Sequence, residues 1–264
     1  MILPNFIILG AAKAGTTALY HYLRQHPEIG MSRIKETNYL ALKGHPLDFQ
    51  GPGDADYIKR FSVTTADGYR DQFLDCGGKK AVGEASPLYL YHPDAPAAIR
   101  ATVPEARLIA ILRNPVDRAF SAFLHLVRDG RETTRDFAEA LRLEPERIAA
   151  HWEHIWHYVG MGRYAEQLER YYAMFPREQI KVIVYRDFRT DPVGVMRDIY
   201  RFLDVDDAFQ ADQTTRHNSG LPPELRPELH ADARDFIRHA LAADTARLPA
   251  LIGHDLTHWN MAGA

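Results

Sequence analysis

The sequence predicts an α/β fold of three layers, in which a central, mostly parallel sheet is flanked by helices. Three short apolar runs carry this prediction. Each is rich in Ile, Val or Leu and lacks clean alternation with polar residues, as strands buried on both faces of a parallel sheet do. Turn residues and then a helical pattern follow each run, so that strand and helix alternate along the chain. The runs are residues 6–9, 108–112 and 180–184.

The helices that follow these runs carry recognisable start signals. Asp191 suits an N-cap and Pro192 suits the first helical position, and an apolar face with helical spacing comes after them. A second helix is expected from Tyr164 to about Phe175. A third is expected to follow Asn114 and to run to about residue 127. The stretch from residue 44 to 78 is rich in Gly, Pro and Asp and predicts loops with a short helix.

The composition is that of an ordinary globular chain. We expect residues 1–264 to form a single domain. Lys and Arg number 32 against 35 Asp and Glu, so the formal net charge is −3 and no general basic field favours nucleic acid. The apolar stretch near the N-terminus is far too short to span a bilayer. Cys76 is the only cysteine, which favours a reducing compartment. We therefore expect a cytoplasmic protein, and the Ala- and Arg-rich composition suggests a bacterial source.

A phosphate-binding loop is the first chemical signal. Gly10 and Gly15 have the spacing of the two glycines in a Walker A loop and directly follow the first predicted strand. Such glycines let several backbone N–H groups point at one phosphate, and the positive end of the following helix adds to them. Here, however, threonines follow the second glycine, and the lysine lies inside the loop, where it could reach a bridging oxygen beyond a 5′-phosphate. The sequence thus predicts a P-loop-like fold whose phosphate-binding residues are Lys13, Ala14, Gly15, Thr16 and Thr17.

An arginine and a serine near the second apolar run provide the second signal. Arg113 lies at the carboxyl end of that predicted strand, the end at which open α/β sheets bind ligands. Ser121 lies near the second turn of the helix that follows. Because a guanidinium and a hydroxyl together suit a phosphate, this pair predicts a second phosphate site.

These motifs resemble those of the PAPS-dependent sulfotransferases, where PAPS is 3′-phosphoadenosine 5′-phosphosulfate. The resemblance is closest to the branch that contains the Golgi heparan sulfate enzymes and many bacterial homologues. It extends over roughly residues 5–222. Its segments are Lys13 to Thr17, Lys35-Glu36 before Asn38-Tyr39-Leu40, Gly83 to Pro87 with Tyr89, Arg113 with Ser121, Gly162 to Tyr164 with Leu168, Phe202-Leu203, and Arg216 to Gly220.

The resemblance implies sulfuryl transfer from PAPS to a hydroxyl or amine of a small-molecule, lipid or sugar acceptor. It implies that the first loop binds the 5′-phosphosulfate, that Arg113 and Ser121 bind the 3′-phosphate, and that Lys13 steadies the leaving oxygen. The loop that closes over the nucleotide would then contain Arg216, His217, Asn218 and Ser219. The sequence carries no signal for the identity of the acceptor or for the oligomeric state.

Two residues are candidates for the general base. Glu36 is the first choice, by the resemblance and because it is adjacent to Lys35. His125 is the rival, since it lies four residues beyond Ser121 on one helix face and titrates near neutral pH. Glu84 could support Lys13 or the acceptor, or serve the structure at a strand end.

No metal is expected. Three histidines (His151, His154 and His157) recur at helical spacing, but tryptophans interleave with them and no acid joins them at a convincing ligand position, so a substrate-facing or core helix is favoured. Two alternatives stay open. A P-loop nucleoside triphosphate kinase would need a lysine after Gly15 and a strand ending in Asp. A catalytically silent nucleotide-binding module is the other.

Overall fold

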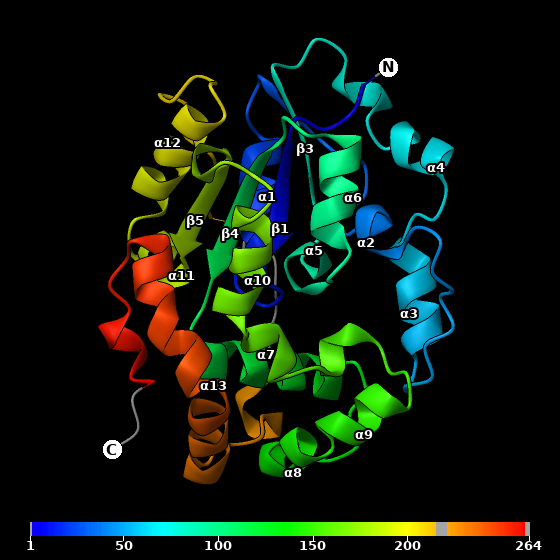
Figure 1. Ribbon diagram of the computed structural model, residues 1–264, viewed down its shortest axis with the longest axis vertical. Coiled ribbons are helices and arrows are strands. Elements are labelled where there is room, and N and C mark those ends of the chain that lie inside the picture. Colours follow the sequence, from blue (N-terminus) through cyan, green and yellow to red (C-terminus); the bar gives the residue numbers. More distant parts are fainter. Residues whose placement is uncertain (1, 215–220, 262–264) are drawn as a thin grey trace. The chain divides into compact units, whose positions relative to one another are not determined.

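The computed structural model describes residues 2–214 and 221–261, and its sheet there consists of five parallel strands (Figure 1). The strand order is β2-β3-β1-β4-β5, so the first strand of the chain lies at the centre. Ile8 of that strand pairs with Ala85 on one side and Ile109 on the other. The predicted α/β fold and all three predicted strands are confirmed. The strands are β1 (Phe6–Gly10), β2 (Ile29–Met31), β3 (Ala81–Ala85), β4 (Arg107–Leu112) and β5 (Ile180–Val184).

The described residues divide into two compact units, which are treated separately below. Unit 1 comprises residues 2–46, 59–112 and 170–214 and contains the sheet; unit 2 comprises residues 47–58, 113–169 and 221–261 and is helical. The α-helices within unit 1 are α1 (Thr16–Arg24), α2 (Tyr39–Leu42), α4 (Ala66–Asp71), α5 (Leu88–Tyr91), α6 (Ala95–Thr102), α11 (Tyr185–Thr190) and α12 (Pro192–Phe202). Those within unit 2 are α7 (Pro115–Arg128), α8 (Phe137–Arg142), α9 (Glu144–Ala149) and α13 (Ala231–Ile252). Helices α3 (Asp54–Phe61) and α10 (Tyr164–Tyr172) cross the division.

Chain direction places helices on both faces of the sheet. The connection from β1 to β2 passes through α1 and moves toward one edge, whereas the connection from β3 to β4 passes through α5 and α6 and moves toward the other. Because such crossovers are right-handed, opposite directions put the helices on opposite faces. Figure 1 shows α6 in front of the strands and α1 behind them. This is the predicted three-layer arrangement.

Tight packing at the centre of the sheet explains one glycine in β3. A Cβ at Gly83 would lie 2.2 Å from the ring of Phe6, which is fully buried in β1. The two residues are register partners, so only glycine leaves room for this ring. The close approach fixes β3 against β1 and therefore fixes the position of the residues that follow both strands.

Helix starts follow the predicted signals. Asp191 caps α12 by accepting a hydrogen bond from the Gly194 amide at 2.9 Å, and Asn114 caps α7 through the Val116 amide at 2.9 Å. The stretch from residue 44 to 78 holds more helix than the single short one predicted, namely α3, α4 and a 3-10 turn (Leu74–Cys76).

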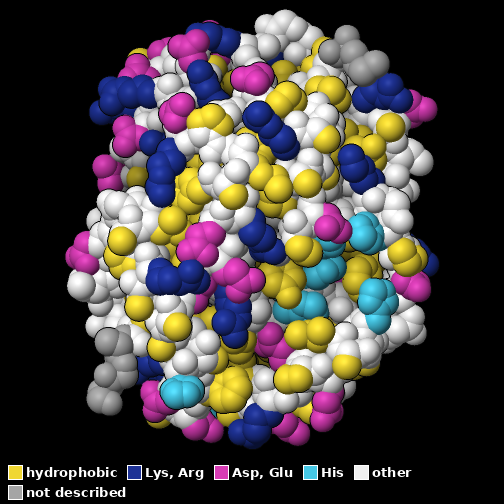
Figure 2. All heavy atoms as spheres, viewed as in Figure 1, with side chains coloured by type: hydrophobic (Ala, Val, Ile, Leu, Met, Phe, Trp, Pro, Cys, Tyr) yellow, Lys and Arg dark blue, Asp and Glu magenta, His cyan; other side chains and the backbone are white. Residues whose placement is uncertain are grey.

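On the face drawn in Figure 2, Lys and Arg side chains are interspersed with Asp and Glu, in keeping with a net charge close to zero.

Candidate active site

The phosphate loop lies at the carboxyl end of β1, the central strand. The amide of Ala11 donates to the carbonyl of Ile111 in β4 at 2.8 Å, so the loop begins as a continuation of the sheet. After β1 the chain crosses to β2 at one side of the sheet, and after β4 it crosses to β5 at the other side. The two connections therefore leave this end of the sheet in opposite directions. Such a reversal of direction opens the crevice in which α/β proteins bind ligands. The predicted loop is therefore at the position in the sheet that favours ligand binding.

Gly15 is required by both conformation and space. Its φ is +104°, and it occupies the N-cap position of α1. A Cβ there would meet ring carbons of Tyr185 at 3.0 and 3.1 Å. Residues other than glycine disfavour this φ, and a side chain here would press on the Tyr185 ring. The turn into α1 therefore requires glycine.

The remaining loop residues suit an anion. Lys13 is half-buried in a left-handed conformation with φ +65°, Ala14 is fully buried, and Thr16 is buried at the first position of α1. Thr17 is half-buried beside it. The first N–H groups of a helix have no partner within the helix, and its dipole favours negative charge there. Together with one lysine, these groups suit a phosphate or sulfate group.

Glu36 is fixed at the end of the neighbouring strand. Its backbone amide donates to the carbonyl of Ala85 at 2.8 Å, and Ala85 ends β3 opposite Ile8 of β1. The carboxylate forms an ion pair with Lys35, and its side chain is 32% exposed, which leaves it accessible to a reactant. Its φ is +69°, a conformation that costs free energy in a residue with a side chain and that is found frequently at functional sites.

A buried carboxylate holds the segment that follows Glu36. Glu84 of β3 is completely buried and accepts hydrogen bonds from four hydroxyl groups. Thr37 donates at 2.5 Å and Ser86 at 2.8 Å; Tyr89 lies at 3.1 Å and Tyr69 also donates. Burial raises the pKa of Glu84, and these hydrogen bonds lower it in part. Of the two roles considered for Glu84, its geometry supports the structural one.

The same hydroxyls also bind the backbone of this segment. Ser86 accepts from the Asn38 amide at 3.1 Å, and Tyr89 accepts from the Leu40 amide at 3.2 Å. Burial raises the pKa of Tyr89 well above its ordinary value, so it keeps its proton and donates to Glu84. The polar network thus positions residues 36–40 from a strand in the core. Sequence reasoning did not find this network, because nothing in the spacing of Thr37 and Tyr69 links them to Glu84.

In unit 2, Arg113 and Ser121 line one open pocket of about 670 Å³. Arg113 comes directly after β4, and Ser121 is on α7, as predicted. The lining also includes two arginines that sequence reasoning missed, Arg226 and Arg234. Arg226 lies over the ring of Phe120, with its guanidinium carbon 5.6 Å from the ring centre. With three arginines and a serine hydroxyl against the acids Asp117 and Glu228, the pocket suits an anion such as a phosphate.

The pocket also bears on the predicted nucleotide loop. Arg216, His217, Asn218 and Ser219 lie outside the described residues. Leu221, the first described residue after them, lines the pocket together with Arg113 and Ser121. The assignment of the four residues stays a prediction.

His125 lies in the last turn of α7 with both ring nitrogens near charged groups. Arg128 is 2.7 Å from Nδ1, and the Asp129 carboxylate is 3.6 Å from Nε2. The ring also meets Tyr57 edge-on. A general base needs a lone pair directed at the acceptor. Since an arginine can only donate to Nδ1, the neutral ring carries its proton on Nε2 and has no lone pair left, which favours Glu36 as the base.

The three histidines considered for a metal have aromatic neighbours instead. His151 stacks on Phe49 at 4.9 Å between ring centres, His154 meets the same ring at 5.4 Å, and His157 packs against His154. Burial lowers the pKa of His157 to about 4, so it stays neutral. The predicted helix is wrong, because α9 ends at Ala149 and only a 3-10 turn (His154–Trp156) follows it, but Trp156 and His157 are buried as a core segment would be.

The fold and the loop together define a class: an α/β protein with a glycine-containing loop after the central strand of a parallel sheet. The model of the sulfotransferase family matches residues 38–210, so the chain belongs to the sulfotransferase family. A crystal structure of a sulfotransferase from Alicyclobacillus acidocaldarius is 42% identical, covers 98% of this chain and 100% of that one, and superposes with a TM-score of 0.90.

Curated relatives include heparan sulfate enzymes, as the sequence motifs indicated. Heparan sulfate glucosamine 3-O-sulfotransferase 3B1 of Mus musculus is 30% identical and matches 89% of this chain and 61% of its own length. Membrane-associated sulfotransferase kil1 of Dictyostelium discoideum is 24% identical and matches 78% of this chain and 57% of its own length. The chain thus spans about three-fifths of these two relatives. Among the described residues, no helix combines the length and hydropathy of a membrane span.

Proposed function

We propose that this protein transfers a sulfuryl group from PAPS to a hydroxyl or amine of a small-molecule, lipid or sugar acceptor. The observation that carries the proposal is the phosphate loop at the end of β1, in which Lys13 lies inside the loop and threonines follow Gly15. Membership of the sulfotransferase family supports it.

Each end of the donor is assigned to residues of one unit. The 5′-phosphosulfate is bound by loop residues of unit 1, namely Lys13, Ala14, Gly15, Thr16 and Thr17. The 3′-phosphate is bound by Arg113 and Ser121 of unit 2, whose pocket has an excess of arginine. Arg216, His217, Asn218 and Ser219 are proposed to close over the nucleotide. Residues 1–264 are proposed to act as one sulfotransferase domain.

The reaction is a direct in-line displacement. The acceptor oxygen or nitrogen forms a bond to sulfur while the bond from sulfur to the bridging oxygen of PAPS breaks. Adenosine 3′,5′-bisphosphate (PAP) leaves with the bonding electrons, and Glu36 takes the acceptor proton. Lys13 and the N–H groups at the start of α1 stabilise the charge that develops on the leaving oxygen, which is the dominant contribution expected in such a site.

A sugar is the favoured acceptor class. The mouse relative is named for heparan sulfate glucosamine, which favours a sugar among the three acceptor classes. The single cysteine, Cys76, is buried and unpaired, and we propose a reducing, cytoplasmic location in a bacterium. The nucleoside triphosphate kinase and the silent module are not favoured by the family membership.

Calorimetric titration of the donor site tests the proposal. We expect PAP to bind much more tightly than ATP with Mg²⁺, because the loop has no lysine after Gly15 for a γ-phosphate. Lys13→Ala should weaken PAP binding, whereas Lys59→Ala, which removes an exposed lysine of α3, serves as the matched control. Tight binding of ATP with Mg²⁺ and weak binding of PAP would instead support a kinase.

A further inference from the structure

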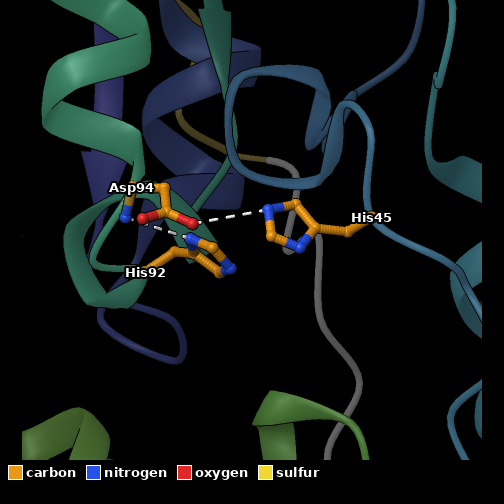
Figure 3. A group of neighbouring side chains, drawn as sticks. All are labelled: His45, His92 and Asp94. Atoms are coloured by element: carbon orange, nitrogen blue, oxygen red, sulfur yellow. Dashed lines mark hydrogen bonds and ion pairs between the residues drawn. The ribbon is translucent and has the colours of Figure 1, made fainter.

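Three potential metal ligands converge on unit 1 away from the phosphate loop. His45, His92 and Asp94 each offer one ligand atom, and these atoms lie within 4.8 Å of one another. Figure 3 shows the carboxylate of Asp94 pointing toward His45, with the ring of His92 beside both. The Asp94 oxygen is 3.4 Å from Nε2 of His45. The residues come from the chain after α2, from the end of α5 and from the start of α6.

We propose that His45, His92 and Asp94 bind a divalent transition-metal ion of the Zn²⁺ class. Two imidazoles and a carboxylate are ligands that Zn²⁺ and its neighbours in the first transition row prefer. Three protein ligands leave at least one coordination position for water, as in open zinc sites. The proposal is independent of sulfuryl transfer, which uses other residues.

The side chain of Asp94 gives independent support. Asp94 is the N-cap residue of α6, a position at which aspartate usually accepts a hydrogen bond from the first turn. Here its side chain makes no capping hydrogen bond and instead contacts His45. The Asp94 carboxylate therefore does not cap α6, although its position in the sequence suits a cap.

Small side-chain rotations would complete the site. Zn²⁺ holds nitrogen and oxygen ligands at about 2.0–2.1 Å in a tetrahedron, which places ligand atoms about 3.3 Å apart. The side chains of His45 and Asp94 are 47% and 62% exposed, so both can close this gap without disturbing the core. His92 is buried at the end of α5 and provides the fixed ligand.

One hydrogen bond and one positive charge oppose metal binding at His92. The amide of Asp94 donates to Nδ1 of His92 at a long 3.3 Å. Coordination through either nitrogen replaces this bond, because binding at Nδ1 uses its lone pair and binding at Nε2 moves the ring proton to Nδ1. The positive charge of Arg170 disfavours another positive charge at His92. The negative charge of Asp94 favours one.

A bound ion would connect segments that are distant in sequence. His45 lies three residues beyond α2, in the stretch of chain that also carries Glu36, and the other two ligands flank Pro93 between α5 and α6. The metal would therefore tie the end of this stretch to α5, which packs on β1, and to the start of α6. The expected consequence is a metal-dependent rise in thermal stability.

Zinc titration of the full chain, without a histidine tag and after removal of metal by chelation, tests the site. We expect one Zn²⁺ per chain by calorimetry, and at least a tenfold loss of affinity in His45→Ala and in Asp94→Ala. His151→Ala is the matched control, because His151 and Asp48 form a similarly exposed pair at 3.2 Å. Its affinity should equal that of the unsubstituted chain.

A second measurement keeps the test valid if calorimetric heats are small. The melting temperature should rise on addition of Zn²⁺ in the unsubstituted chain and in His151→Ala, and not in Asp94→Ala. Circular dichroism checks that the variants fold. Absence of zinc binding, or equal binding and equal melting shifts in the two ligand variants and the control, would overturn the proposal.

Discussion

The backbone amide of Glu36 donates a hydrogen bond to the carbonyl of Ala85 at 2.8 Å, and this contact attaches the proposed base to the end of β3. Ala85 is the register partner of Ile8 in β1, so Glu36 is held at the carboxyl end of the strand next to β1, which the phosphate loop follows. The position of Glu36 is thereby set by the sheet and not by the loop alone. Its backbone is left-handed, with a φ of +69°.

The base assignment leads to the first prediction. Glu36→Gln should lower kcat by about 100-fold or more, the range for loss of a general base, while the affinity for PAP stays unchanged. Arg128 and Asp129 already engage both ring nitrogens of His125, so this residue should not act as the base. His125→Ala should therefore mainly raise the KM for the acceptor and leave kcat nearly unchanged. Steady-state kinetics with calorimetry separates the two effects. An active Glu36→Gln together with a His125→Ala that loses kcat and keeps binding would reverse the assignment.

The arginine-lined pocket leads to the second prediction. Arg113→Ala should weaken binding of PAP by about 1.5–3 kcal/mol, the scale for a charged hydrogen bond, and should affect adenosine 5′-monophosphate far less. Arg142→Ala is the control, since Arg142 is exposed on α8 and does not line the pocket. Calorimetry with both ligands checks this. Equal losses for the two nucleotides in Arg113→Ala would rule out a 3′-phosphate site there.

The third prediction concerns the turn before α1. Gly15→Ala combines an unfavourable φ with a Cβ 3.0 Å from the ring of Tyr185, whereas Gly78→Ala has a similar φ of +77° and nothing within 4 Å. We expect Gly15→Ala to lower the free energy of unfolding by about 1–3 kcal/mol more than Gly78→Ala does, because of the added steric conflict. PAP affinity should fall in the first variant alone. Urea denaturation measures the difference, and matching losses would show that the ring simply moves aside.

The buried carboxylate leads to the fourth prediction. Burial raises the pKa of Glu84 above 4.5, so the folded chain binds this proton more tightly than the unfolded chain does. Stability from this group is therefore complete at low pH and is lost as the pH rises through the raised pKa. The unsubstituted chain and Glu84→Gln differ in their free energy of unfolding. This difference, unsubstituted minus variant, should decrease as the pH rises through the pKa of Glu84. Denaturation at a series of pH values measures it; a difference that grows with pH would contradict the account.

The sequence was sufficient for the strands with continuous apolar residues and insufficient for the others. β1, β4 and β5 are recognisable because Ile, Val and Leu dominate their sequences. β3 contains Gly83 and Glu84, and neither residue signals a strand. Only the structure shows that the glycine accommodates the Phe6 ring and that the carboxylate accepts four hydroxyls. β2 has three residues and gives no periodic pattern.

The same contrast holds for the candidate site. Lys13 and Arg113 were found because each directly follows a recognisable strand, a relation that is local in sequence. Arg226 follows Arg113 by more than a hundred residues, and the sequence shows no link between them. His45 is similarly remote from His92 and Asp94. Such groups are brought together by packing, which the spacing of residues along one chain does not encode.

Transfer of labelled sulfate from PAPS tests the central claim most directly. The unsubstituted chain is incubated with labelled PAPS and a panel of phenols, alcohols, sugars and amines, and formation of labelled product is measured together with release of PAP. We predict equal amounts of the two products with at least one acceptor. We also predict a rate at least about 100-fold lower in Lys13→Ala, the scale for losing one charge-stabilising donor. Transfer at an undiminished rate in Lys13→Ala, or no labelled product with any acceptor, would contradict the account.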